Sequence, residues 1–283
     1  MAEKIRNLVR QYPIATVVVT FLLCYAGYWF VPTPNEATAV LQRALLSAAL
    51  FGVMALAGGA EALRWEKGSF GRSFRLGKSV LLVTAGMAVF ALIVSAFTTP
   101  VQAGWAGRLA FSAIDALTVG LFEESWFRGV FQSGIVARTG KTRGGMTFAV
   151  VFSGMAFGFL HVATDVFSGS MTFSALIQIV GKTLQTGFVG ILLGAVFLAT
   201  KNIWAAALIH ALNDFILFTV SAFFGGGEVT SYVDRTSSWV SELPMVLFMV
   251  ALHAILLVAA LRILKKLPLP QAGLWKTPQR PEA

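Results

Sequence analysis

The sequence predicts an all-α fold: a polytopic integral membrane bundle of about eight transmembrane helices. The first observation is composition, because 57% of the residues are hydrophobic, 12% are charged and the mean hydropathy is +0.75. Soluble domains carry roughly 25% charged residues. The second observation is that the apolar residues come in blocks of about 20, the length that a helix needs to cross a hydrocarbon core about 30 Å thick. The short alternating segments that a membrane β-barrel requires are absent.

Eight apolar blocks define the spans in chain order. Prolines after the first block (Pro32, Pro34) and the third block (Pro100) end those helices. The predicted spans cover residues 12–31, 37–60, 79–98, 108–137, 146–163, 171–199, 203–224 and 242–264. A basic loop is expected over residues 61–78. We expect one transmembrane domain over residues 1–283, with its motif region at 108–220 and a flexible cytoplasmic tail at 265–283.

The basic residues predict the topology. With the N-terminus inside, 17 of the 22 Lys and Arg residues fall in inner segments, while the outer loops hold Arg108 and Arg235. Inner loops of membrane proteins carry an excess of Lys and Arg. We therefore expect both termini to be cytoplasmic in a bacterial-type inner or plasma membrane. A net charge of +9 could also indicate nucleic acid, but these residues lie in short loops between spans, so the expected partner is the lipid bilayer and not a nucleic acid.

Several residues inside the spans have structural interpretations. Cys24, the single cysteine, is expected to fill space, and His253 is expected to be a hydrogen-bonded packing residue. Arg43 lies near a helix end, from which its side chain can reach the interface. A polar stripe with helical spacing predicts interhelical hydrogen bonds, with a wet cavity as the alternative; it comprises Ser174, Gln178, Lys182 and Gln185. Two GxxxG pairs allow close helix approach: Gly154 with Gly158, and Gly190 with Gly194.

The first candidate site cluster lies in the middle of the fourth predicted span. Glu124 and Arg128 are four residues apart on a helix, so they share a face and can form an ion pair. Glu123 is turned by about 100° from Glu124 and does not share that partner. A carboxylate without a partner in a low-dielectric cavity suits a general base.

Two further clusters carry the other polar groups of the bundle. Phe157 and His161 share one helix face, and His210 shares another with Asn213 and Asp214. Straight, upright helices would place the three clusters at different depths, because each residue adds about 1.5 Å along the helix. We therefore expect tilted helices, a kink at a glycine of the fifth span, or an unwound stretch before residue 146.

Together the three clusters resemble the motifs of the CPBP family, which contains intramembrane proteases related to the type II CAAX prenyl endopeptidases. The matching patterns are Glu123-Glu124-x-x-x-Arg128, Phe157-x-x-x-His161 and His210-x-x-x-Asp214, in the order that the family has them. The resemblance spans about residues 108–220. It implies an endopeptidase that depends on a glutamate and cleaves membrane-associated proteins or peptides inside a membrane cavity.

The resemblance also implies a role for each motif residue. Glu123 would activate water with the help of His161, while Glu124 and Arg128 would pair. His210 and the residue one turn later would stabilise the oxyanion. An ionised Asp214 cannot donate a hydrogen bond, whereas the amide of Asn213 can, so the sequence leaves that role open between these two residues.

Three alternatives remain at this stage. No cofactor is expected, but zinc held by Glu123, His161 and His210 is an alternative, although the HExxH pattern is absent and the two histidines are far apart in sequence. A transporter or ion relay would use the charged residues inside the spans, but no inverted repeat supports it; these residues are Glu123, Glu124, Lys182 and Asp214. A non-catalytic immunity or scaffold protein would keep the polar residues for packing.

Overall fold

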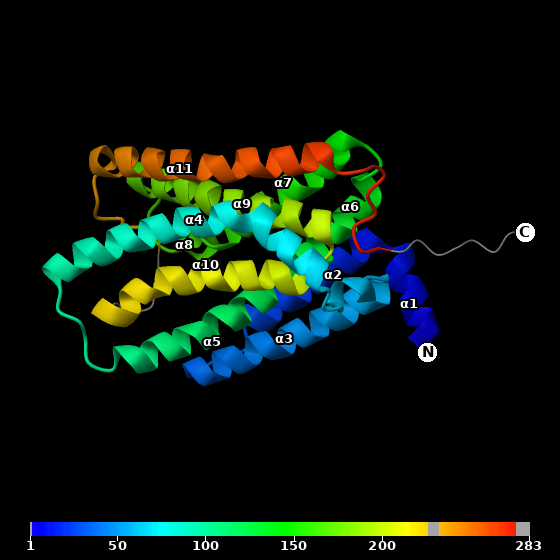
Figure 1. Ribbon diagram of the computed structural model, residues 1–283, viewed down its shortest axis with the longest axis horizontal. Helices are drawn as coiled ribbons and strands as arrows, with labels where there is room; N and C mark the ends of the chain where they lie inside the picture. The colour runs from blue at the N-terminus through cyan, green and yellow to red at the C-terminus, as the bar shows by residue number, and fades with distance from the viewer. Residues whose placement is uncertain (1, 226–231, 276–283) are drawn as a thin grey trace, which may run out of the picture.

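The computed structural model describes residues 2–225 and 232–275, and every regular element within them is a helix (Figure 1). The elements are α1 (Ala2–Gln11), α2 (Pro13–Trp29), α3 (Glu36–Ala57), η1 (Ala60–Leu63), α4 (Lys67–Thr98), α5 (Trp105–Glu124), η2 (Ser125–Gln132), α6 (Ser133–Thr139), α7 (Arg143–Leu160), α8 (Ala163–Phe167), α9 (Phe173–Thr200), α10 (Ile203–Phe224) and α11 (Trp239–Lys266). Seven helical segments are long and apolar enough to cross a membrane, and the bent pair α1–α2 makes up to eight. This confirms the predicted polytopic helical bundle.

Two basic segments outside the predicted spans are helical. The tail before the first span forms α1, which turns by 103° into α2. Pro13 begins α2, where its missing N–H and fixed φ suit the first turn of a helix. The expected loop at 61–78 is mostly helix, because α4 begins at Lys67. α4 therefore begins before the predicted apolar span, with a basic extension.

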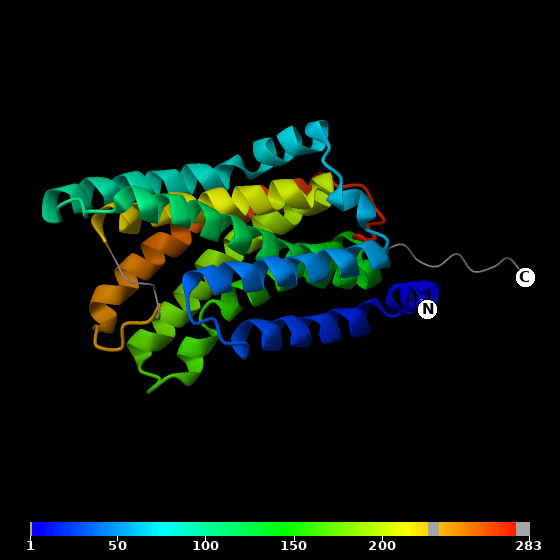
Figure 2. The ribbon, with the colours of Figure 1, turned by 90° about the horizontal axis from the view of Figure 1, so that it is seen from below.

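The fifth span begins without the unwound stretch that we expected before residue 146. α7 starts at Arg143, and the Thr142 side chain accepts a hydrogen bond from the Gly145 N–H. Such a cap satisfies one of the unpaired donors at a helix start. Tilt, another of the expected features, is present in the bundle: α11 (orange) and α9 (yellow-green) run obliquely to α4 (cyan) in Figure 2.

The segment after α11 corrects the prediction of a flexible tail at 265–283. Lys266 is still helical, and the chain that follows packs on the bundle as far as Trp275. The Trp275 indole donates to the carbonyl of Val9, and the Gln271 N–H donates to the carbonyl of Gly140. Burial of an indole stabilises such a segment because its apolar surface leaves water. The rest of the expected tail, residues 276–283, lies outside the described residues.

Close approach of helix backbones is the main packing device of the core. The most extensive pairings are α5 with α10, α9 with α11 and α7 with α9. A Cβ atom on Gly158 of α7 would lie 2.2 Å from the Thr183 carbonyl oxygen of α9. A Cβ atom on Gly120 of α5 would lie 2.5 Å from the Ala207 carbonyl oxygen of α10. Only glycine allows these contacts, as the GxxxG pairs predicted for α7 and α9.

Replacing Gly158 by Ala is expected to lower the free energy of unfolding by about 1–3 kcal/mol, because the added methyl group forces α7 and α9 apart. The matched control is Gly144→Ala on the same helix, where an added Cβ meets nothing within 4 Å. That control should be neutral or slightly stabilising, since Ala has the higher helix propensity. Thermal unfolding in detergent measures both; equal melting temperatures for the two variants would contradict the close contact.

Candidate active site

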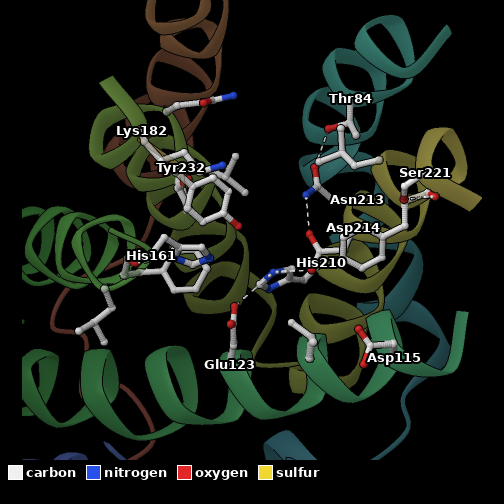
Figure 3. A pocket seen from close by; sticks show the side chains of 18 of the residues that line it. Thr84, Asp115, Glu123, His161, Lys182, His210, Asn213, Asp214, Ser221 and Tyr232 are labelled. Carbon is white, nitrogen blue, oxygen red and sulfur yellow. Dashed lines mark hydrogen bonds and ion pairs between the residues drawn. The ribbon is translucent and has the colours of Figure 1, made fainter. Parts of the chain in front are cut away.

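The residues of the three predicted motifs meet at one cavity of about 860 Å³. Glu123 from α5, His161 from the end of α7, and His210, Asn213 and Asp214 from α10 line it (Figure 3). Cavities of about 300–1,000 Å³ are typical of ligand sites in proteins. The expectation that these helices carry their polar groups to one place is therefore confirmed by their positions.

A fully buried ion pair lies behind the cavity lining. Arg128 Nε lies 3.1 Å from Glu124 Oε2, and neither side chain has any exposed surface. The guanidinium carbon of Arg128 also lies 4.7 Å from the centre of the Phe157 ring, a cation–π contact. This is the i, i+4 pair that the spacing predicted. A buried charge requires such a partner, because an unpaired one is strongly destabilising.

His210 joins the ion pair to the cavity. Its Nδ1 lies 2.9 Å from Glu124 Oε1, and its Nε2 lies 3.5 Å from Glu123 Oε2. The same Nε2 lies 3.4 Å from Asp214 Oδ2. As the sequence predicted, Arg128 pairs with Glu124 rather than with Glu123. That both glutamates would contact one imidazole was not predicted, because it depends on how α10 packs on α5.

The helix changes its hydrogen-bonding pattern directly after Glu124. Residues 125–132 form η2, a π-helical stretch with i→i+5 bonding, before α6 resumes the α-helix. Side chains satisfy backbone carbonyls in this stretch: the Ser133 hydroxyl donates to Arg128, and the Gln132 amide donates to Gly194 of α9. Short π-helical segments occur frequently at functional sites. The sequence contains no signal for this change that we could identify.

His161 caps the end of α7 and faces the cavity from the side opposite α10 (Figure 3). Its Nδ1 lies 2.9 Å from the Phe157 carbonyl oxygen, which only an N–H can satisfy. The other nitrogen, Nε2, is then an acceptor in the neutral ring. The Phe157 ring packs edge-on against both His161 and His210, with centroid distances of 4.6 and 5.7 Å. Phe157 therefore spaces the two imidazoles.

Asn213 and Asp214 form a chain of hydrogen bonds behind His210. The Asn213 amide nitrogen donates to Asp214 Oδ1 at 3.1 Å, and its carbonyl oxygen accepts a hydrogen bond of 2.5 Å from the Thr84 hydroxyl of α4. Asp214 presents its second oxygen to His210. Thr84 was not a predicted site residue, since a threonine in an apolar span carries no pattern of its own.

The cavity walls carry further charges. Arg43 does not reach the interface as predicted: it is buried and forms an ion pair with Asp115 of α5, which also lines the cavity. The ammonium of Lys182 lies 4.0 Å from the centre of the Tyr232 ring on the opposite wall. Asp115 could have been found from the sequence, because a carboxylate eight residues before Glu123 falls in the same span.

The polar stripe of α9 has both of the fates that were weighed for it. Gln178 hydrogen-bonds the backbone at Asp234, in the loop before α11, and Ser174 contacts Ser237 there. These bonds join α9 to a loop. The predicted interhelical bond is made by Gln185, whose Nε2 lies 3.5 Å from His253 Nε2 of α11. Lys182 and Gln185, one and two turns further along than Gln178, also line the cavity. His253 of α11 is hydrogen-bonded through Nδ1 to the Met249 carbonyl, as its apolar surroundings predicted.

The alternative zinc set of Glu123, His161 and His210 does not form a metal-holding group. Within residues 2–225 and 232–275, no three His, Cys, Asp or Glu side chains are placed to bind one metal ion.

Comparison with known proteins identifies the central part of the chain. Residues 104–216 match the model of the family described as type II CAAX prenyl endopeptidase Rce1-like. This stretch contains all three motifs and every residue that contacts His210 through an ion pair. No curated protein and no solved structure matches the chain. Residues 104–216 are therefore similar to the Rce1-like type II CAAX prenyl endopeptidase domain, in agreement with the resemblance that the three motifs indicated.

Proposed function

We propose that the chain is a glutamate-dependent intramembrane endopeptidase that cleaves membrane-associated proteins or peptides. The observation that supports this best is the position of Glu123. Its carboxylate lines the cavity, retains 20% of its side-chain exposure there and lies 3.5 Å from His210. Glu124, its neighbour, is fully buried in the ion pair with Arg128. One glutamate is thus held in place while the other can meet a substrate.

In the proposed reaction, the Glu123 carboxylate takes a proton from a water molecule, and the oxygen of that water attacks the carbonyl carbon of the scissile peptide bond. His161 would orient the water through Nε2, since its Nδ1 is held by the Phe157 carbonyl. His210 would donate to the oxyanion of the tetrahedral intermediate. Glu123 then passes its proton to the leaving amine as the C–N bond breaks.

The remaining motif residues would act by positioning His210. Glu124, fixed by Arg128, accepts the hydrogen bond from Nδ1 and so sets the orientation of the ring. An ionised Asp214 can only accept, so we assign it to orienting Nε2 and not to binding the oxyanion. Asn213 would orient Asp214 in turn, because its amide nitrogen donates to that carboxylate.

The family description makes a prenylated CAAX peptide the first substrate to test. A peptide tethered to a transmembrane segment and lacking any prenyl group is the second. Cleavage of either by the purified chain in proteoliposomes would support the proposed activity, and the pair would show whether a lipid tail is required.

Glu123→Gln should reduce the cleavage rate by about 10²–10⁴-fold, because the amide cannot take the proton from water. Its melting temperature should stay close to that of the unchanged protein, since Glu123 is not in the buried ion pair. Glu36→Gln, an exposed carboxylate at the start of α3, is the matched control and should leave cleavage unchanged. Undiminished cleavage by Glu123→Gln would sink the proposed role of Glu123 as the base.

Glu124→Ala and Arg128→Ala should each lower the free energy of unfolding by about 3–5 kcal/mol, because each leaves an unpaired charge in the core. The double variant should lose less than the sum of the two, since neither charge then remains. Thermal unfolding of the four proteins gives the coupling. Additive losses would show that the two side chains do not depend on one another.

His210→Ala should reduce kcat by about 10²–10³-fold if His210 supplies the oxyanion donor. Asp214→Asn should reduce kcat by a smaller factor, because the His210 ring is still held by Glu124. Asn213→Ala should reduce kcat by a smaller factor still, because Asn213 only orients Asp214. If His210 holds the oxyanion, KM should change little in all three variants, since the oxyanion exists only after binding. The opposite ranking, with Asn213→Ala the most damaging, would assign the oxyanion to the amide of Asn213.

A further inference from the structure

The cavity occupies only one half of the bundle. α4 and α10 both run away from the face that carries Lys78 and Lys201, and they contribute lining residues only from Thr84 and His210 onward. α9 runs the other way and contributes none beyond Val189. Every helix that lines the cavity therefore does so with the part remote from the basic loops.

The half of the bundle next to the basic loops is solidly packed. The Glu124–Arg128 pair lies outside the cavity lining and has no exposed surface. Beyond it, large side chains from several helices interlock without exposed surface; they include Met54, Val136, Met146, Val150, Leu192 and Val196. Close-packed interiors have few voids larger than a water molecule, so these buried side chains leave no open path for a peptide. A substrate cannot reach Glu123 from the basic face.

The other end of the cavity reaches the opposite face. Its lining continues to Trp29, Thr99 and Gly225, which lie at the ends of α2, α4 and α10, and to Tyr232 in the loop before α11. Trp29 is 44% exposed and Tyr232 is 40% exposed. These residues form the mouth of the cavity.

The two basic residues of that face hold the surrounding loops. Arg108 donates to the carbonyls of Ala222 and Gln102, next to the end of α10. Arg235 donates to the carbonyls of Ser170 and Asp165. Both side chains are therefore used for local structure, and the face has no cluster of basic residues that would mark it as cytoplasmic.

We infer that the active site is entered from the extracytoplasmic face, opposite the basic loops. The substrate is then an extended segment of an exported or membrane-anchored protein whose scissile bond lies on that side. This rests on the proposed protease function for the site and on the distribution of Lys and Arg for the direction. The cavity volume of about 860 Å³ suits a short peptide segment and excludes a folded domain.

Cysteine labelling of the full chain tests the entrance. In a Cys24→Ala background, which removes the buried thiol, Thr99→Cys marks the mouth and Lys141→Cys marks the exposed basic loop between α6 and α7. A membrane-impermeant maleimide should label Thr99→Cys in intact cells and Lys141→Cys only after permeabilisation. The reverse pattern would overturn the assigned direction.

The same two variants test which end admits substrate. In detergent micelles, a bulky maleimide on Thr99→Cys should remove most cleavage of an added peptide, measured against the same variant before labelling. Labelling of Lys141→Cys should leave its cleavage unchanged. If labelling removes cleavage by Lys141→Cys and not by Thr99→Cys, the entrance lies at the basic face. If the unchanged protein and both unlabelled variants all fail to cleave any peptide, the result contradicts the proposed protease function. It then says nothing against the direction of entry.

Discussion

The buried ion pair between Glu124 and Arg128 is the constraint on which the rest of the site depends. Two charges without exposed surface are costly in an apolar bundle. Their mutual attraction offsets that cost only when the geometry is good and further hydrogen bonds satisfy the remaining donors and acceptors. One carboxylate oxygen of Glu124 is not used by Arg128, and His210 Nδ1 lies 2.9 Å from it. The pair thus determines where the imidazole must lie, and the imidazole determines which groups meet Glu123.

Small residues make that arrangement possible. α5 and α10 touch through Gly120, Ala207 and Ala211, one turn from the functional side chains on each helix. At that separation, Glu124 and His210 reach one another without any backbone irregularity in α10. The mutual position of the catalytic candidates is therefore set by contacts between backbones, which are stiffer than contacts between long side chains.

Much of this could be predicted from the sequence, and the reasons for the failures are physical. Span positions follow from apolar length, and the Glu124–Arg128 pair follows from i, i+4 spacing, because both are local properties. The sharing of His210 by two glutamates and the pairing of Arg43 with Asp115 join different helices, so no local pattern contains them. Trp275 was assigned to a flexible tail because prolines surround it. Its burial depends on a contact with a distant part of the chain, where its indole donates to the Val9 carbonyl.

The π-helical stretch also bears on how this chain can change in length. A π-helix accommodates more residues per turn than an α-helix, so it holds the register between Glu124 before it and the core-facing residues of α6 after it. Deleting one residue from 125–132 would permit ordinary i→i+4 bonding and would leave α6 close to its present orientation relative to α5. The same deletion within a regular α-helix would rotate everything after it by about 100°. The helix segment beside the site is therefore the part of this span that can lose one residue with the least displacement of α6.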